Sequence, residues 1–100
     1  MKLEQTILKN LIYNEEYLRK VLPFLKTEYF SDLTERTIYN EITSFTETYN
    51  TTASIEAIGI AIKERRNLTA DEAQKCEDYL KEIENNRQEK TEVQWLVDKT

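Results

Sequence analysis

Hydrophobic residues recur every three or four positions along almost the whole chain, which is the spacing of one face of an α-helix. A first stripe comprises Leu3, Ile7, Leu8, Leu11 and Ile12, and a second, shorter stripe comprises Tyr17, Leu18, Val21 and Leu22. We expect Asn14 to mark the break between these two helices. Pro23 should end the second, because proline cannot continue the backbone hydrogen bonding of a helix.

After a connector that carries Tyr29 and Phe30, the hydrophobic pattern predicts the longest helix of the first half of the chain. Asp32 followed by Glu35 is typical of a capping box, in which each side chain bonds a backbone amide at the start of a helix. The apolar face of this helix should consist of Ile38, Ile42, Phe45 and Tyr49. A polar connector over residues 50–53 should follow it.

Two more helices and an incomplete one are predicted behind that connector. Ser54 can cap a helix whose buried side is Ile55, Ile58 and Ile62, with Gly59 allowing a neighbour to approach closely. Thr69 and Glu72 form a second predicted capping box, and the helix behind it should turn inward Ala73, Cys76, Leu80 and Ile83 and fray near Asn85 and Asn86. A last segment with Val93, Trp95, Leu96 and Val97 has the pattern of another helix, which stops at Thr100. Because so short a helix is unstable alone, we expect the chain to be part of a longer protein.

Composition agrees with one all-α domain. The 100 residues include one glycine and one proline, too few for the turns of a sheet protein, and 39% are hydrophobic, which favours a folded chain over a disordered one. A domain of this length buries about two-thirds of its unfolded surface. The longest apolar run, residues 57–62, is too short to cross a bilayer, and a carboxylate near the N-terminus argues against a signal peptide, so we expect an intracellular protein.

Several kinds of chemistry are excluded by missing residue types. The chain has no histidine, one cysteine (Cys76) and one glycine (Gly59). It therefore cannot build a Ser-His or Cys-His nucleophile pair, a zinc site of soft ligands, or a glycine-rich phosphate loop, and we expect no catalytic, metal or cofactor site. The adjacent carboxylates Glu15-Glu16, Asp71-Glu72 and Glu77-Asp78 point to different helix faces, and we interpret them as solvated surface.

The negative charge lies mainly in the last third of the chain. Residues 1–69 contain nine Lys or Arg against ten Asp or Glu, and residues 70–100 contain five against nine, so the net charge of −5 divides into −1 and −4. The densest basic group, residues 63–66, lies at a predicted helix end, where cations complement the helix dipole. We therefore predict no strong binding to nucleic acid.

Aromatic residues are the best candidates for a contact with other proteins. The six tyrosines mostly follow the hydrophobic stripes and are expected to be half-buried with their hydroxyls in solvent. Trp95 lies outside the main run of helices, and tryptophan is favoured at interface centres. The candidate partner interface consists of Tyr13, Tyr17, Trp95, Leu96 and Val97.

The order and spacing of residues near the N-terminus resemble the N-terminal domain of DnaB-type replicative helicases. The opening motif of that family is matched by Glu4, Gln5, Ile7, Leu8, Leu11, Ile12 and Asn14, and a later motif, counted from Phe30, is matched by Arg36, Ile38-Tyr39 and Glu41-Ile42. The chain departs from bacterial members at Lys9 and Asn10, where they tend to have small residues, and at Glu35, where they often have histidine.

Further segments are similar to the replicative helicases of T-even-like tailed phages. These are Leu11-Ile12-Tyr13, Tyr17, Lys20-Val21, Pro23-Phe24, Glu28-Tyr29-Phe30, Ser54-Ile55 with Ala57, and Trp95-Leu96-Val97. The resemblance implies a compact helical head of five or six helices over residues 1–86, followed by a linker and the root of a helical hairpin over residues 87–100. It also implies a phage-encoded protein of the host cytoplasm.

In that family the domain forms a collar on the hexameric ring and helps to dock primase, while a separate motor domain binds ATP and Mg and unwinds DNA. The resemblance therefore implies three partners: other helicase subunits, primase and a helicase loader. No ATPase activity is expected from these residues, and without the rest of the hairpin we expect a monomer or weak dimer. Two alternatives remain: a freestanding acidic phage protein-interaction module, and a helical DNA-binding regulator.

Overall fold

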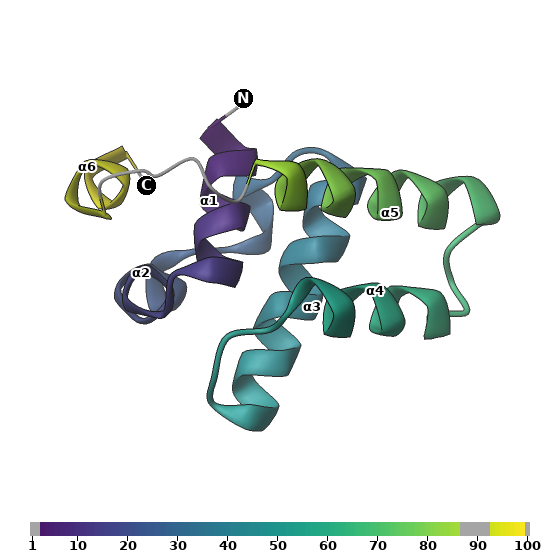
Figure 1. The fold of residues 1–100 in the computed structure, drawn as a ribbon, viewed down its shortest axis with the longest axis horizontal. Helices are drawn as coiled ribbons and strands as arrows, with labels where there is room; N and C mark the ends of the chain where they lie inside the picture. The colour runs from purple at the N-terminus through teal and green to yellow at the C-terminus, as the bar shows by residue number, and fades with distance from the viewer. Residues whose placement is uncertain (1–2, 87–92, 100) are drawn as a thin grey trace.

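The computed structural model describes residues 3–86 and 93–99, and within these ranges the chain forms helices and no strand (Figure 1). The elements in chain order are α1 (Leu3–Tyr13), α2 (Glu15–Val21), the 3₁₀ turns η1 (Leu22–Phe24) and η2 (Thr27–Tyr29), α3 (Leu33–Tyr49), α4 (Ile55–Glu64), α5 (Ala70–Asn85) and α6 (Val93–Lys99). The predicted all-α fold is confirmed. At 17 residues, α3 is longer than α1 and α2, so the predicted longest helix of the first half is confirmed.

The helices are arranged around α3. In Figure 1, α4 and α5 lie side by side and run across α3, while α1 packs on α3 from the other side. Helix α2 packs on α1, and α6 packs on α2 at the left end of the molecule. All six helices contribute to one hydrophobic core, with Leu8, Leu18, Ile38, Ile58, Leu80 and Leu96 as one buried member of each.

Short side chains fix where the helices begin. The side chains of Asn14, Ser54 and Thr69 accept hydrogen bonds of 3.1, 3.0 and 3.1 Å from the backbone amides of residues 17, 57 and 72. Each bond satisfies one of the amides that a helix start leaves without a partner. The predicted break at Asn14 and the predicted caps at Ser54 and Thr69 are confirmed. Helix α2 ends at Val21, and Pro23 lies in the 3₁₀ turn that follows.

The predicted capping box at α3 is only half correct. The Asp32 carboxylate caps the helix by accepting a 2.7 Å bond from the amide of Thr34. Glu35 does not turn back to the helix start: it is 3% exposed, and its carboxylate accepts a 2.8 Å hydrogen bond from the hydroxyl of Tyr79 on α5. Glu35 therefore bonds Tyr79 on another helix instead of capping the start of its own helix.

Three further expectations differ from the structure. Tyr49 is 65% exposed, because α3 extends past the helices that cover its earlier turns. A Cβ placed on Gly59 would meet nothing within 4 Å, so no neighbour approaches there. The hydroxyls of Tyr39 and Tyr79 bond the Leu25 carbonyl and Glu35 instead of pointing into solvent. Of the predicted linker and hairpin root over residues 87–100, residues 87–92 and 100 lie outside the described residues.

Candidate protein-interaction surface

The five predicted interface residues lie on or beside the corner formed by α2 and α6, but they divide into buried and exposed members. Tyr17 and Leu96 are fully buried in the core, and Val97 is partly buried against it. Tyr13 and Trp95 remain 43% and 49% exposed. Tyr17 and Leu96 are therefore core residues in this structure. A partner that docks on this corner meets the other two aromatic side chains.

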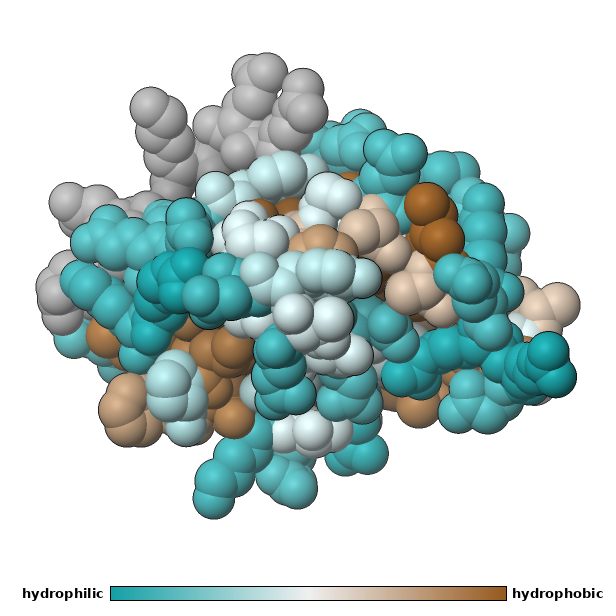
Figure 2. Space-filling model, turned by 90° about the horizontal axis from the view of Figure 1, so that it is seen from below, coloured by the Kyte–Doolittle hydropathy of each residue, from teal (hydrophilic) through white to brown (hydrophobic). Residues whose placement is uncertain are grey.

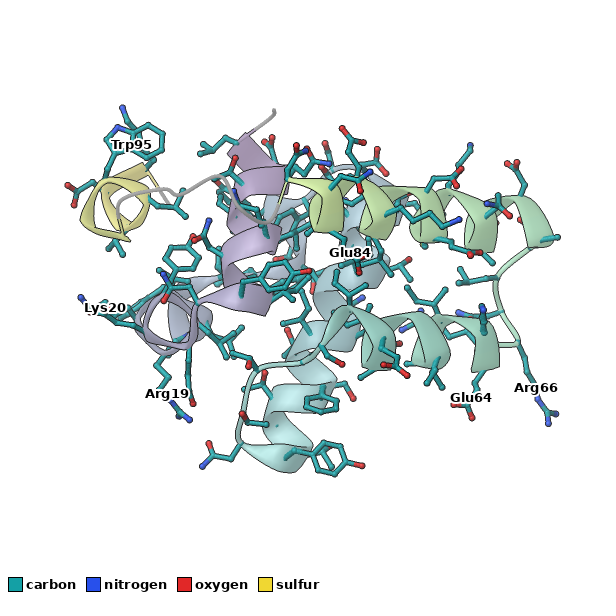
Figure 3. All side chains as sticks on the ribbon, viewed as in Figure 1. Arg19, Lys20, Glu64, Arg66, Glu84 and Trp95 are labelled. Atoms are coloured by element: carbon teal, nitrogen blue, oxygen red, sulfur yellow. The ribbon has the colours of Figure 1, made fainter. Side chains whose placement is uncertain are left out.

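The burial of Leu96 explains why the neighbouring Trp95 side chain is exposed to solvent. Leu96 is the fully buried residue of α6 among those described, Val97 packs beside it against the core, and α6 packs on α2. Neighbouring residues on a helix point to different sides. Figure 3 shows the indole of Trp95 projecting from α6 on the side away from α2. Large aromatic groups held on an ordered helix are typical anchors of protein contacts.

A second exposed aromatic group, which the hydrophobic pattern did not single out, lies on η1. Phe24 is 82% exposed, beside a hollow of about 470 Å³ between α2, η1 and α3. The hollow is lined by Leu18, Arg19, Leu22, Pro23, Leu25, Tyr39, Thr43, Thr46 and Glu47. The stripe of Leu18, Val21, Leu22 and Leu25 continues at helical spacing, and Phe24 falls off it. This position off the hydrophobic stripe was the feature of the sequence that could have indicated that Phe24 is exposed.

A third apolar region lies between the C-terminal half of α3 and α4. The rings of Phe45 and Tyr49 pack at a tilted angle with their centroids 4.7 Å apart, and Ile60 is exposed across the groove. Figure 2, which views the molecule from below, shows hydrophobic surface both towards the α2 end and towards the α4 end of this face. The molecule thus offers several apolar patches of modest size.

Several charged groups form ion pairs on the surface. Glu15, Glu16, Asp71 and Glu77 each pair with a basic residue four positions later on the same helix. This confirms that they are surface carboxylates. In the basic group at the end of α4, Arg65 donates a 2.6 Å hydrogen bond to Glu41 of α3, so its charge is used within the fold. Figure 3 shows Glu64 and Arg66 projecting outward beside it.

Two polar residues that depart from the bacterial pattern are buried. Lys9 is 3% exposed, and its ammonium group lies 3.4 Å from the backbone carbonyl of Asn86 at the end of α5, where the helix dipole favours a cation. Asn10 donates a 2.9 Å hydrogen bond to the carbonyl of Thr6 in the preceding turn. Lys9 therefore ties α1 to the point where α5 ends.

Burial changes the acidity of several groups in the core. Burial, and after it the hydrogen bond and charge of Glu35, raises the pKa of Tyr79 far above its ordinary value. Burial also raises the pKa of the Cys76 thiol and of Tyr39. Over residues 3–86 and 93–99 no group of three or more histidine, cysteine or acidic side chains comes together in a way that could hold a metal ion.

Comparison with known proteins identifies the class to which this fold belongs. The family model of the DnaB-like helicase N terminal domain matches residues 1–97, so the chain belongs to that family. Searches of curated proteins and of solved structures found no match. Among the described helices, none is long and apolar enough to cross a membrane.

Proposed function

We propose that this chain is the collar domain of a phage replicative DNA helicase, which holds subunits together and contacts primase. The single observation that carries the proposal is the family match over residues 1–97. The phage assignment rests on the similarity of segments such as Pro23-Phe24 and Trp95-Leu96-Val97 to helicases of T-even-like phages. The domain would act in the cytoplasm of the host cell.

The proposed division of labour places the chemistry elsewhere. ATP and Mg would be bound by a motor domain that follows this chain in the full-length protein, and a helicase loader would be a further partner. Residues 1–86 would form the head, and residues 87–100 would lead into a helical hairpin. The packing of α6 on α2 through Leu96 supports a fixed exit for that hairpin.

The corner carrying Tyr13 and Trp95 is the best candidate for the primase contact. Both side chains are about half exposed and belong to ordered helices. We expect Trp95→Ala to weaken binding to the primase of the same genome about tenfold in biolayer interferometry, because truncating an aromatic anchor at an interface centre typically costs this much. Tyr49→Ala is the matched control, since Tyr49 is an exposed tyrosine on the far end of α3. Equal affinity of wild type and Trp95→Ala would refute this assignment.

A second candidate is a freestanding acidic interaction module, favoured by the −4 charge of residues 70–100. The acidic side chains of α5 outnumber its lysines, so a basic protein surface would be attracted to it. The two proposals differ in the gene. A reading frame that continues into a glycine-rich phosphate loop supports the helicase, and a stop codon directly after Thr100 supports the module.

A further inference from the structure

A hollow of about 700 Å³ lies where α5 meets α1 and the start of α3, and we call it the α1–α5 hollow. It is lined by Gln5 of α1, by Asp32 and Thr34 at the start of α3, and by Lys75, Asp78, Tyr79 and Glu82 of α5. In Figure 1, α5 extends from α1 away from the corner formed by α2 and α6. The α1–α5 hollow is therefore separate from the proposed primase contact.

The charged groups around this hollow are mainly acidic. Among its described lining residues, Asp32, Asp78 and Glu82 are acidic and Lys75 is basic. The ammonium group of Lys75 lies 3.4 Å from the carboxylate of Asp71, so an acidic partner one turn away already balances its charge. Asp78 and Glu82 are four residues apart on α5 and therefore share one face of the helix. The wall favours a positively charged occupant.

Gln5 provides an independent indication that the α1–α5 hollow takes a ligand. Gln5 is 5% exposed, and its carboxamide makes no hydrogen bond to the residues that the structure describes. Among these residues, every buried side-chain nitrogen or oxygen that is shut off from solvent has a hydrogen-bond partner. The unbonded carboxamide of Gln5 therefore reaches the open space of the hollow that it lines. Because a largely buried amide is costly without a hydrogen bond, a polar ligand at this place would stabilise it.

Oxygen acceptors are available on the wall of the hollow. Asp32 and Asp78 each accept one hydrogen bond, of 2.7 and 3.0 Å, from a group on their own helix, and both bonds use the oxygen Oδ1. A carboxylate has a second oxygen that can accept. The hydroxyl of Tyr79 donates to Glu35 and keeps a lone pair as an acceptor. A matching ligand therefore carries several N–H donors.

A guanidinium group fits these acceptors better than a metal ion does. A metal ion needs its oxygen ligands within about 2.6 Å of one point. Over residues 3–86 and 93–99, no group of three or more histidine, cysteine or acidic side chains can hold a metal ion. A guanidinium group instead spreads five N–H donors over a plane, so it can bond acceptors that lie further apart.

We propose that the α1–α5 hollow binds a guanidinium group on an alkyl stem, held by the carboxylates of Asp78 and Glu82 and the carboxamide oxygen of Gln5. This chemistry is shared by free alkylguanidines and by an arginine side chain of another protein. The inference goes beyond the proposed function and does not depend on the primase contact. Because the carboxylates face solvent, binding of the isolated group should be weak, with a dissociation constant on the order of 1 mM.

The test is an NMR titration of the ¹⁵N-labelled 100-residue chain with n-butylguanidinium chloride. The side-chain amide signals of Gln5 and the backbone amide signal of Glu82 should shift and reach saturation. n-Butylammonium chloride has the same charge and stem but a compact head with three donors, so it should bind at least about threefold more weakly. No saturable shift at these signals up to about 50 mM, or equal binding of the two cations, would overturn the inference.

Two glutamate variants separate this site from general attraction of cations to an acidic helix. Glu82→Gln should raise the dissociation constant of n-butylguanidinium about threefold or more, because it removes a charged acceptor from the hollow. Glu84→Gln removes the same charge from an exposed position of α5 that does not line the hollow. Its effect should stay below about 1.5-fold, since salt screens distant surface charges. Equal effects of the two variants would overturn the site.

Gln5 and the source of the ligand are tested in the same titration. Gln5→Met keeps a long side chain but removes the carboxamide, so it should also weaken binding, and the NMR spectrum itself checks that the variant is folded. The peptide acetyl-Gly-Arg-Gly-amide distinguishes the two sources. Binding as tight as that of n-butylguanidinium supports an arginine of a partner protein as the ligand, and binding of n-butylguanidinium alone supports a free alkylguanidine. Unchanged affinity in Gln5→Met would overturn the role given to Gln5.

Discussion

The hydroxyl of Tyr79 on α5 donates a 2.8 Å hydrogen bond to the carboxylate of Glu35 on α3, joining residues 44 positions apart. Glu35 is 3% exposed, so this bond provides the carboxylate with a buried hydrogen-bond donor. Removing one partner of a buried hydrogen bond leaves the other unsatisfied, which costs more than the bond contributes on average. The pair therefore ties α5 to the central helix.

We expect Tyr79→Phe to lower the free energy of unfolding by about 1–3 kcal/mol, because the buried Glu35 carboxylate then loses this donor. Urea denaturation measures the change. Tyr49→Phe is the matched control, since it removes the hydroxyl of an exposed tyrosine, and it should change stability by less than about 0.5 kcal/mol. Equal stability of the two variants would contradict the role given to this bond.

The same pair predicts a loss of stability at alkaline pH. Burial, with Glu35 as a further cause, raises the pKa of Tyr79 in the folded state. Below about pH 10 both states keep the proton, but above it the unfolded chain loses the proton while the folded chain holds it. The free energy of unfolding should therefore fall by up to about 1.4 kcal/mol per pH unit from this group.

Denaturation midpoints measured between pH 9 and about pH 11 test this dependence. Tyr29, Tyr39 and Cys76 also have pKa values raised mainly by burial, and they give every variant a common background slope. Tyr79→Phe should show a shallower slope than wild type, and Tyr49→Phe should keep the wild-type slope. Identical slopes in Tyr79→Phe and wild type would show that Tyr79 ionises equally in both states.

Gly59 should be replaceable with a gain in stability. It lies inside α4 with helical neighbours on both sides, and an added Cβ would meet nothing within 4 Å. Alanine is favoured over glycine in a helix interior, so we expect Gly59→Ala to raise the free energy of unfolding by about 0.5–1 kcal/mol. Gly59→Ser, with a weaker helix former, should gain less. A loss of stability in Gly59→Ala would reveal a close neighbour at this position.

Leu96 should hold α6 to the head. The Leu96 side chain is fully buried, and its helix α6 packs on α2. Truncation of a buried leucine typically lowers the free energy of unfolding by about 2–5 kcal/mol. In Leu96→Ala we expect the amides of α6 to lose protection in hydrogen exchange, while α3 and α5 keep theirs. Trp95→Ala, one residue earlier and half exposed, should keep the protection of α6. Unchanged exchange in Leu96→Ala would show that α6 is held by other contacts.

Local sequence patterns predicted the helices because local interactions decide them. The apolar spacing and the capping side chains Asn14, Ser54 and Thr69 act within a few residues, and they lie where they were expected. Contacts between distant segments were not predictable in this way. Glu35 faces inward because Tyr79 provides a donor from α5, and Lys9 is buried because the end of α5 lies beside it.

At the candidate interaction surface, too, local patterns predicted some features, while others depend on contacts between distant segments. The pattern placed Tyr17 and Leu96 on apolar stripes, but only the packing of α6 on α2 shows that both are buried and that Trp95 is turned outward. Phe24 was visible only as a residue off its stripe. Its exposure depends on how η1 packs in the folded chain, which local spacing does not encode.

The central claim is that this domain belongs to a ring-forming helicase subunit. Native mass spectrometry of the gene product purified from its own host, with ATP and Mg present, tests it most directly. We expect a protein longer than these 100 residues that assembles into six-membered rings. A product of 100 residues that remains a monomer or dimer would contradict the claim.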